Sequence, residues 1–96
     1  MKKHAAVESD IMDGVRWYAD ISPTLALEYL AEVETAFTSI AQNPWIYRIR
    51  FGDIRRMNTR KFKLAIYFTI HRKDIIVLSV FHPSRDHKKW LQSRRT

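Results

Sequence analysis

The dipeptide Asn43-Pro44 divides this 96-residue chain into two segments with different hydrophobic patterns. Before it, apolar side chains recur every three or four residues, as they do on one face of an α-helix. They form two stripes: Val7, Ile11, Val15 and Tyr18, then Ala26, Leu30, Val33, Phe37 and Ile40. Ser22-Pro23 lies between the stripes and is typical of a helix start. We therefore expect two antiparallel helices packed face to face, with Phe37 on the inner stripe of the second helix.

After Pro44 the pattern changes to β-branched and aromatic runs. Residues 45–47 predict a loop, residues 54–60, 64–70 and 75–81 predict three strands, and residues 72–74 predict a tight turn. The last two runs are apolar on both faces, as in strands that are covered on each side. Residues 86–96 predict one or two helical turns that add contact groups but few core residues.

These elements predict a fold of the α+β class in one domain over residues 1–96. We expect an N-terminal antiparallel helical hairpin packed on a small antiparallel β-sheet, followed by a short C-terminal tail or helix.

Composition excludes several kinds of site. The chain has no cysteine and only two glycines, Gly14 and Gly52, so thiolate metal sites and glycine-rich phosphate loops are excluded. His82 and His87 have no carboxylate cluster to complete a metal site, so we expect no metal and no cofactor. The longest strongly apolar run, residues 75–81, is far shorter than the ~20 residues of a membrane span. We expect a cytoplasmic protein without a membrane partner.

Charge is distributed very unevenly along the chain. Residues 1–47 carry a net charge of −4, whereas residues 48–96 carry +11. A block of one sign usually faces a partner of the opposite sign, such as nucleic acid or an acidic protein segment. Four cations of the basic block are candidate contacts for an acidic protein partner or a nucleic acid: Arg55, Arg56, Arg60 and Lys61. If a strand continues through them, Arg56 and Arg60 share one face, and Arg55 and Lys61 share the other.

A set of short motifs resembles the RelE/ParE superfamily of toxins from type II toxin-antitoxin systems, and is most similar to the ParE-like, plasmid-stabilisation branch. In chain order the motifs are Trp17-Tyr18, Ser22-Pro23, Asn43-Pro44, Gly52-Asp53, Arg55-Arg56, Ala65-Ile66-Tyr67, residues 75–82, Arg85-Asp86 and Trp90. The resemblance implies growth inhibition and a cognate antitoxin, which we expect to be acidic. The family usually has a strand before its first helix. Residues 1–7 leave room only for a short strand or for none.

The resemblance implies two alternative activities. ParE-like proteins look like inhibitors that bind DNA gyrase and need no catalytic group, and this reading makes Arg85, Lys88, Lys89 and Trp90 the target-binding residues. RelE-like proteins look like ribosome-dependent mRNA endoribonucleases that use basic residues with a tyrosine or histidine. For that activity the catalytic candidates are His82, Arg85 and His87. A toxin-derived binding module without toxicity is a third possibility.

The residues favour the gyrase reading. No tyrosine follows Tyr67 in the sequence, and Trp90 lies near the place where a proton-transferring tyrosine would act. An indole has no proton to transfer near neutral pH. We therefore expect binding of DNA gyrase, with the ribosome and mRNA as the alternative target.

Overall fold

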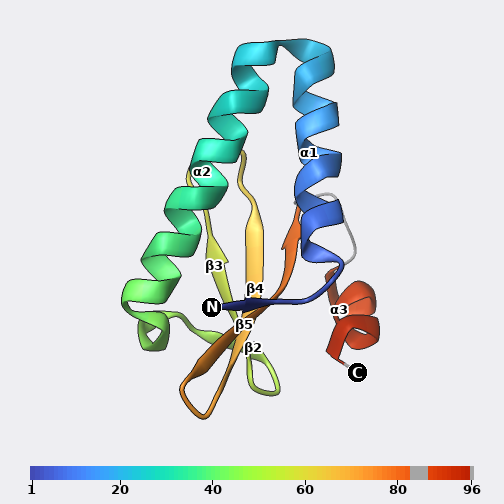
Figure 1. Cartoon of the computed structure of the whole chain (residues 1–96). Helices are drawn as coiled ribbons and strands as arrows, with labels where there is room; N and C mark the ends of the chain where they lie inside the picture. Colours follow the sequence, from blue (N-terminus) through green and yellow to red (C-terminus); the bar gives the residue numbers. More distant parts are fainter. Residues whose placement is uncertain (83–86, 96) are drawn as a thin grey trace.

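The sheet has helices on both faces, and its first strand, β1, lies beside its last strand, β5 (Figure 1). The computed structural model describes residues 1–82 and 87–95, without the side chains of Lys88 and Arg95. The elements in chain order are β1 (Lys2–Lys3), α1 (Val7–Ile21), α2 (Pro23–Gln42), a 3-10 turn (Pro44–Ile46), β2 (Ile49–Phe51), β3 (Ile54–Asn58), β4 (Ala65–His71), β5 (Asp74–Phe81) and α3 (His87–Arg95). The strand order is β1-β5-β4-β3-β2. The predicted α+β class is confirmed.

The helical hairpin forms as predicted, but the buried face of α2 extends beyond the predicted stripe. Ser22 is extended, with φ −165° and ψ 132°, and this single residue separates α1 from α2. Tyr29 and Ala36 are fully buried, whereas Phe37 is half-buried and has the Lys3 amine 5.0 Å from its ring centroid. The predicted inner stripe is confirmed at Ala26, Val33 and Ile40, and Phe37 packs at the border of the core as a partly buried side chain. Tyr29 is the aromatic residue that α2 contributes to the core.

Strands β3, β4 and β5 pair in antiparallel fashion, and the edges of the sheet differ from the prediction. β1 is present and pairs in parallel with β5 through Lys2↔Ile76 and Lys3↔Val77, so the sheet is mixed. At the other edge, β2 lies within a segment where no strand was predicted. β3 ends at Asn58, so Arg60 and Lys61 lie in the turn before β4 and the expected alternation of their faces does not apply.

Each face of the sheet supports its own hydrophobic cluster, because neighbouring residues of β4 point to opposite faces. Ile66 and Phe68 pack with α1 and α2 in the larger cluster. Tyr67 packs in the smaller cluster with Leu91 of α3, which is 2% exposed. Among the described residues, α3 adds few core side chains, as predicted, but its buried Leu91 closes the second core.

A buried ion pair holds α3 against the opposite end of the chain. Arg94 donates through Nη2 to Oδ1 of Asp10 at 2.8 Å and through Nη1 to Oδ2 of Asp10. The side chains of Arg94 and Asp10 are only 8% and 3% exposed. Such a two-point contact fixes both the distance and the orientation of the partners. It joins α3 to the first turn of α1.

The same pair satisfies the backbone of β5 where β1 ends. The last β1 residue pairs with Val77, so the strand edge beyond it has no neighbouring strand. There the Val80 N–H donates to Asp10 Oδ2 at 3.0 Å, and the Leu78 carbonyl accepts from Arg94 Nη1 at 3.3 Å. Buried backbone groups without partners are costly. Asp10 and Arg94 therefore replace the missing part of the edge strand.

Replacing Gly14 with alanine should destabilise the protein, although alanine normally favours a helix by ~1 kcal/mol over glycine. A Cβ at position 14 would lie 2.3 Å from both Cζ and Oη of Tyr29. Because this ring is buried, we expect a net loss of about 1 to 2 kcal/mol in the free energy of unfolding, measured by urea titration. Ala19→Gly, at an exposed position of α1, is the reference variant: it measures the difference in helix propensity between alanine and glycine without the contact to Tyr29. A stabilised Gly14→Ala variant would contradict this packing.

Removing the arginine of the buried pair should have a much larger effect. Arg94→Ala leaves the Asp10 carboxylate buried without its counter-charge, which typically costs ~3 to 5 kcal/mol. Arg16→Ala is the matched control, because Arg16 and Asp13 form an exposed pair at 3.3 Å on the same helix as Asp10. That control should cost less than ~1 kcal/mol. Equal losses for the two variants, measured by urea titration, would show that the Asp10–Arg94 pair does not hold the fold together.

Candidate functional site

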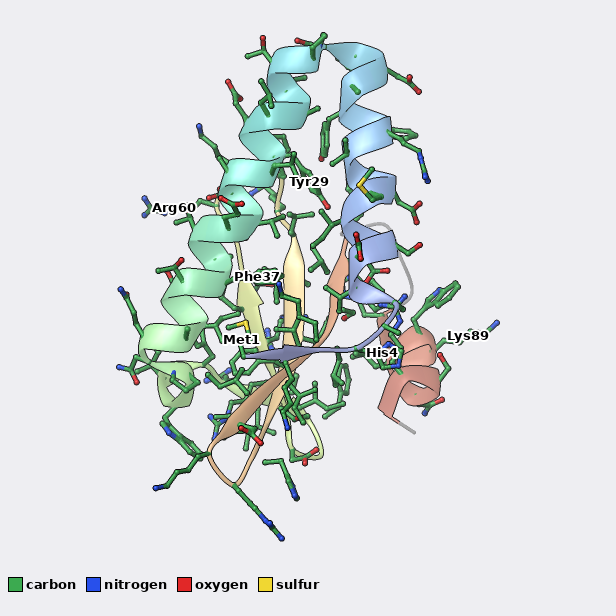
Figure 2. All side chains as sticks on the ribbon, viewed as in Figure 1. Met1, His4, Tyr29, Phe37, Arg60 and Lys89 are labelled. Carbon is green, nitrogen blue, oxygen red and sulfur yellow. The ribbon has the colours of Figure 1, made fainter. Side chains whose placement is uncertain are left out.

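The exposed face of α3 is the candidate site, and its orientation depends on three inward residues. His87, Leu91 and Arg94 recur at helical spacing and face the sheet, while Lys89 and Trp90 lie on the exposed side. Trp90 is 45% exposed, and the Arg94 guanidinium lies 5.9 Å from its ring centroid. Figure 2 shows Lys89 pointing away from the protein. The helix thus presents a cation beside an indole.

His87 attaches the first turn of α3 to the sheet. Its Nδ1 is 2.8 Å from the Tyr67 hydroxyl, and its Nε2 is 2.9 Å from the His82 carbonyl oxygen. The imidazole also packs against the Phe81 ring, with centroids 5.3 Å apart. Because both ring nitrogens have partners, His87 is positioned as a structural contact between α3, β4 and the end of β5.

Tyr67 extends this contact to a cation. Arg56 Nη1 donates to the Tyr67 hydroxyl at 3.3 Å, so Arg56, Tyr67 and His87 form one hydrogen-bonded chain. Sequence reasoning missed Tyr67 because it looked for a tyrosine after this position. The side chain is 0% exposed, so the hydroxyl lies beneath the surface. The hydrogen bonds that link Arg56, Tyr67 and His87 therefore stabilise the packing of α3.

The other predicted catalytic residues do not join His87 in a described site. The His82 side chain is exposed and lines a different pocket, which also includes Asp10 and Asp13 of α1. Arg85 lies outside the described residues, as does the side chain of Lys88. Their predicted roles stay predictions. Of the predicted target-binding residues, the structure brings together Lys89 and Trp90.

Two of the four basic candidates, Arg55 and Arg56, have side chains that bind partners within the protein. Arg55 Nη1 donates to the carbonyl oxygens of Tyr47 at 2.6 Å and Trp45 at 3.3 Å, and its guanidinium lies 5.2 Å from the Trp45 ring centroid. Arg55 therefore shapes the turn after α2, just as Arg56 supports Tyr67.

The remaining two cations face a helix rather than a sheet surface. Arg60 and Lys61 border a groove with α2, and the Lys61 backbone N–H donates to Glu32 Oε2 at 2.9 Å. Arg60 and Lys61 themselves are exposed. Arg55, Arg56, Arg60 and Lys61 thus do not form one continuous surface, and of these four only Arg60 and Lys61 are exposed.

Asp10 and Arg94 are the positioning residues that sequence reasoning missed. Asp10 lies three residues after Val7 and four before Gly14, so it falls on the inward face of α1. A carboxylate on an inward face is a signal that a buried cation is needed. The sequence alone does not identify which of the many cations pairs with Asp10.

The described ranges 1–82 and 87–95 contain neither a metal-binding cluster nor a membrane-spanning helix. No group of three or more histidine, aspartate or glutamate side chains there is arranged to hold a metal ion. No helix within those ranges has the length and apolar character needed to cross a membrane.

Comparison with known families assigns the class of protein. A family model described as the ParE toxin of type II toxin-antitoxin systems, parDE, matches residues 2–87. The match therefore covers the helical hairpin and the whole sheet, and it ends at the first residue of α3. A comparison with curated proteins finds no match. The chain belongs to the ParE family of toxins of type II toxin-antitoxin systems.

Proposed function

We propose that this toxin inhibits DNA gyrase by binding and that a cognate acidic antitoxin neutralises it. Membership of the ParE family supports the toxin class. One observation carries the choice of a binding mechanism: both nitrogens of His87 are engaged, while the exposed groups of α3 are Lys89 and Trp90. An ammonium and an indole suit recognition, and neither is a good proton-transfer group near neutral pH.

One arrangement favours the alternative, ribosome-dependent cleavage of mRNA. Arg56, Tyr67 and His87 are linked by hydrogen bonds, and a cation with a tyrosine and a histidine is a reasonable set for phosphoryl chemistry. A general acid or base must, however, come within hydrogen-bond reach of the reacting atom. Tyr67 is 0% exposed beneath α3, so RNA would reach it only after α3 had moved. Binding requires no such movement.

The antitoxin is proposed from charge. Residues 48–96 carry a net charge of +11, and Arg60, Lys61 and Lys89 are exposed cations of that segment. An acidic segment would be attracted to these positions from a distance and then fixed by apolar contacts. Exposed Trp45 and Ile46, in the turn before β2, would provide apolar contact area on the basic half.

Purified toxin should stop gyrase from supercoiling relaxed plasmid in the presence of ATP, or should cause cleaved complexes to accumulate. In a parallel translation reaction, primer extension should show an intact message. The double variant Lys89→Ala/Trp90→Ala should lose at least about tenfold in potency, because it removes the exposed groups of α3. Lys73→Ala, in the exposed turn between β4 and β5, should keep full potency. Circular dichroism and urea titration verify that each variant is folded.

Codon-position cuts in the message that disappear in Arg56→Ala or His87→Ala would contradict this proposal and support the ribonuclease. A folded toxin without effect in either reaction would indicate a binding module without toxicity. Inhibition that is equally strong with the Lys89→Ala/Trp90→Ala variant would show that gyrase contacts another surface.

Association with the antitoxin should slow as salt is added. Charges separated by more than ~10 Å are largely screened at 0.1 M ionic strength. We expect the association rate constant from stopped-flow fluorescence to fall by about tenfold between ~0.05 M and ~0.5 M salt, while dissociation changes less. An association rate indifferent to salt would mean that the net charge of residues 48–96 does not guide the encounter.

A further inference from the structure

A pocket of about 230 Å³ lies between α1, α2 and the end of β5. Three aromatic side chains, Trp17, Tyr18 and Tyr29, line it together with the carboxylates of Asp10 and Asp13. Lys89 and Trp90 are not among its lining residues, so the proposed contact with gyrase does not use it. This combination of aromatic faces and carboxylates is the chemistry that recognises organic cations.

Of the aromatic side chains that line the pocket, Tyr18 and Tyr29 are packed against other rings, whereas Trp17 is exposed. Tyr18 and Tyr29 pack with ring centroids 5.3 Å apart, and Phe62 supports Tyr18 at 4.6 Å. Trp17 is 65% exposed although it is one of the largest apolar side chains of the protein. A flat cation such as a guanidinium stacks well on aromatic faces of this kind.

Tyr29 brings a polar group, its hydroxyl, to the wall of the pocket. Tyr29 is 1% exposed and lines the pocket, and its ring occupies the space that a Cβ at Gly14 would need. In the described part of the chain, no hydrogen bond is made by this hydroxyl. Burial raises the pKa of Tyr29, and the nearby Asp10, Tyr18 and Asp13 raise it further, so the hydroxyl stays neutral. A neutral hydroxyl in a pocket can accept a hydrogen bond from a ligand.

The two carboxylates differ in how readily they can meet a ligand. Asp10 is committed to Arg94 and to the Val80 N–H. Asp13 contacts only the exposed Arg16, at 3.3 Å, among the ion pairs of the described residues. Exposed pairs of this type are weak and exchange easily. Asp13 and the Tyr29 hydroxyl are therefore the acceptors that an incoming cation would use.

We propose that this pocket binds the guanidinium group of an arginine side chain presented by a partner protein. The five N–H donors of a guanidinium can reach the Asp13 carboxylate and the Tyr29 hydroxyl together, while its plane lies against Trp17. A lysine ammonium matches this flat, forked arrangement less well.

The surroundings of the pocket favour a protein partner over a small metabolite. Ile21 lies one helical turn after Trp17 on the same face of α1 and is 64% exposed, so apolar contact area continues beyond the pocket. Residues 1–47 carry a net charge of −4, which attracts a basic segment. The partner is thus a chain with an arginine flanked by apolar residues. This inference does not depend on the proposed inhibition of gyrase.

The test is an NMR titration of the full chain with N-acetyl-arginine-N-methylamide, which mimics an arginine within a protein. The Gly14 amide and the Trp17 indole N–H should shift together and saturate at millimolar concentration. Asp13→Asn should weaken binding by about tenfold, because it removes a charge-assisted hydrogen bond. Asp20→Asn, an exposed carboxylate on α1 that does not line the pocket, is the matched control and should leave the affinity unchanged.

Two further ligands test whether the pocket prefers a guanidinium over an ammonium group, and whether that group comes from a protein or from a small metabolite. N-acetyl-lysine-N-methylamide should bind several-fold more weakly, and equal binding would overturn the preference for a guanidinium. Agmatine should bind no tighter than the blocked arginine, and markedly tighter binding would assign the pocket to a small metabolite instead of a protein. Absence of shifts at Gly14 and Trp17, or equal affinities of Asp13→Asn and Asp20→Asn, would overturn the proposal entirely. Unchanged amide spectra elsewhere show that each variant is folded.

Discussion

The buried ion pair between Asp10 and Arg94 is the contact on which the arrangement of this toxin depends. It connects α1 with α3 and at the same time satisfies two backbone groups of β5 beyond the end of β1. A buried pair contributes little net stability compared with apolar packing, but loss of one partner is very costly. The main effect of the ion pair is therefore to fix the position of α3. It places α3 on the second face of the sheet, where Leu91 completes the smaller core.

The position of α3 determines what the protein can present to a target. His87 and Arg94 are engaged at the two ends of the helix, so the helix turns Lys89 and Trp90 outward and covers Tyr67. Tyr67 and His87, which are suited to proton transfer, are used within the fold, whereas Lys89 and Trp90, which are suited to contact, are exposed. This division is what a binding inhibitor requires. Family membership establishes the toxin class, and this geometry is the reason for proposing the binding mechanism.

Much of the fold could be predicted from local patterns, because helical spacing and β-branched runs are properties of neighbouring residues. The helical hairpin and strands β3 to β5 followed in this way. The partner of Asp10 could not be predicted, since the pair is separated by 84 residues and the inward face of α3 carries two polar side chains, His87 and Arg94. Strand β2 has only three residues and two of them are exposed. For the site, the exposure of Trp90 was foreseeable, but the contact between Tyr67 and His87 required the fold.

Native-state hydrogen exchange tests the role of the ion pair most directly. The Val80 amide donates to Asp10 rather than to a neighbouring strand, and α3 is attached by the same carboxylate. If the pair unites these elements, the amides of Val80, Leu91 and the β4–β5 ladder should exchange with nearly the same opening free energy, that of global unfolding. If the amides of Leu91 and Val80 instead open several kcal/mol below the ladder, α3 is an independent, loosely attached element and the ion pair does not unite it with the sheet.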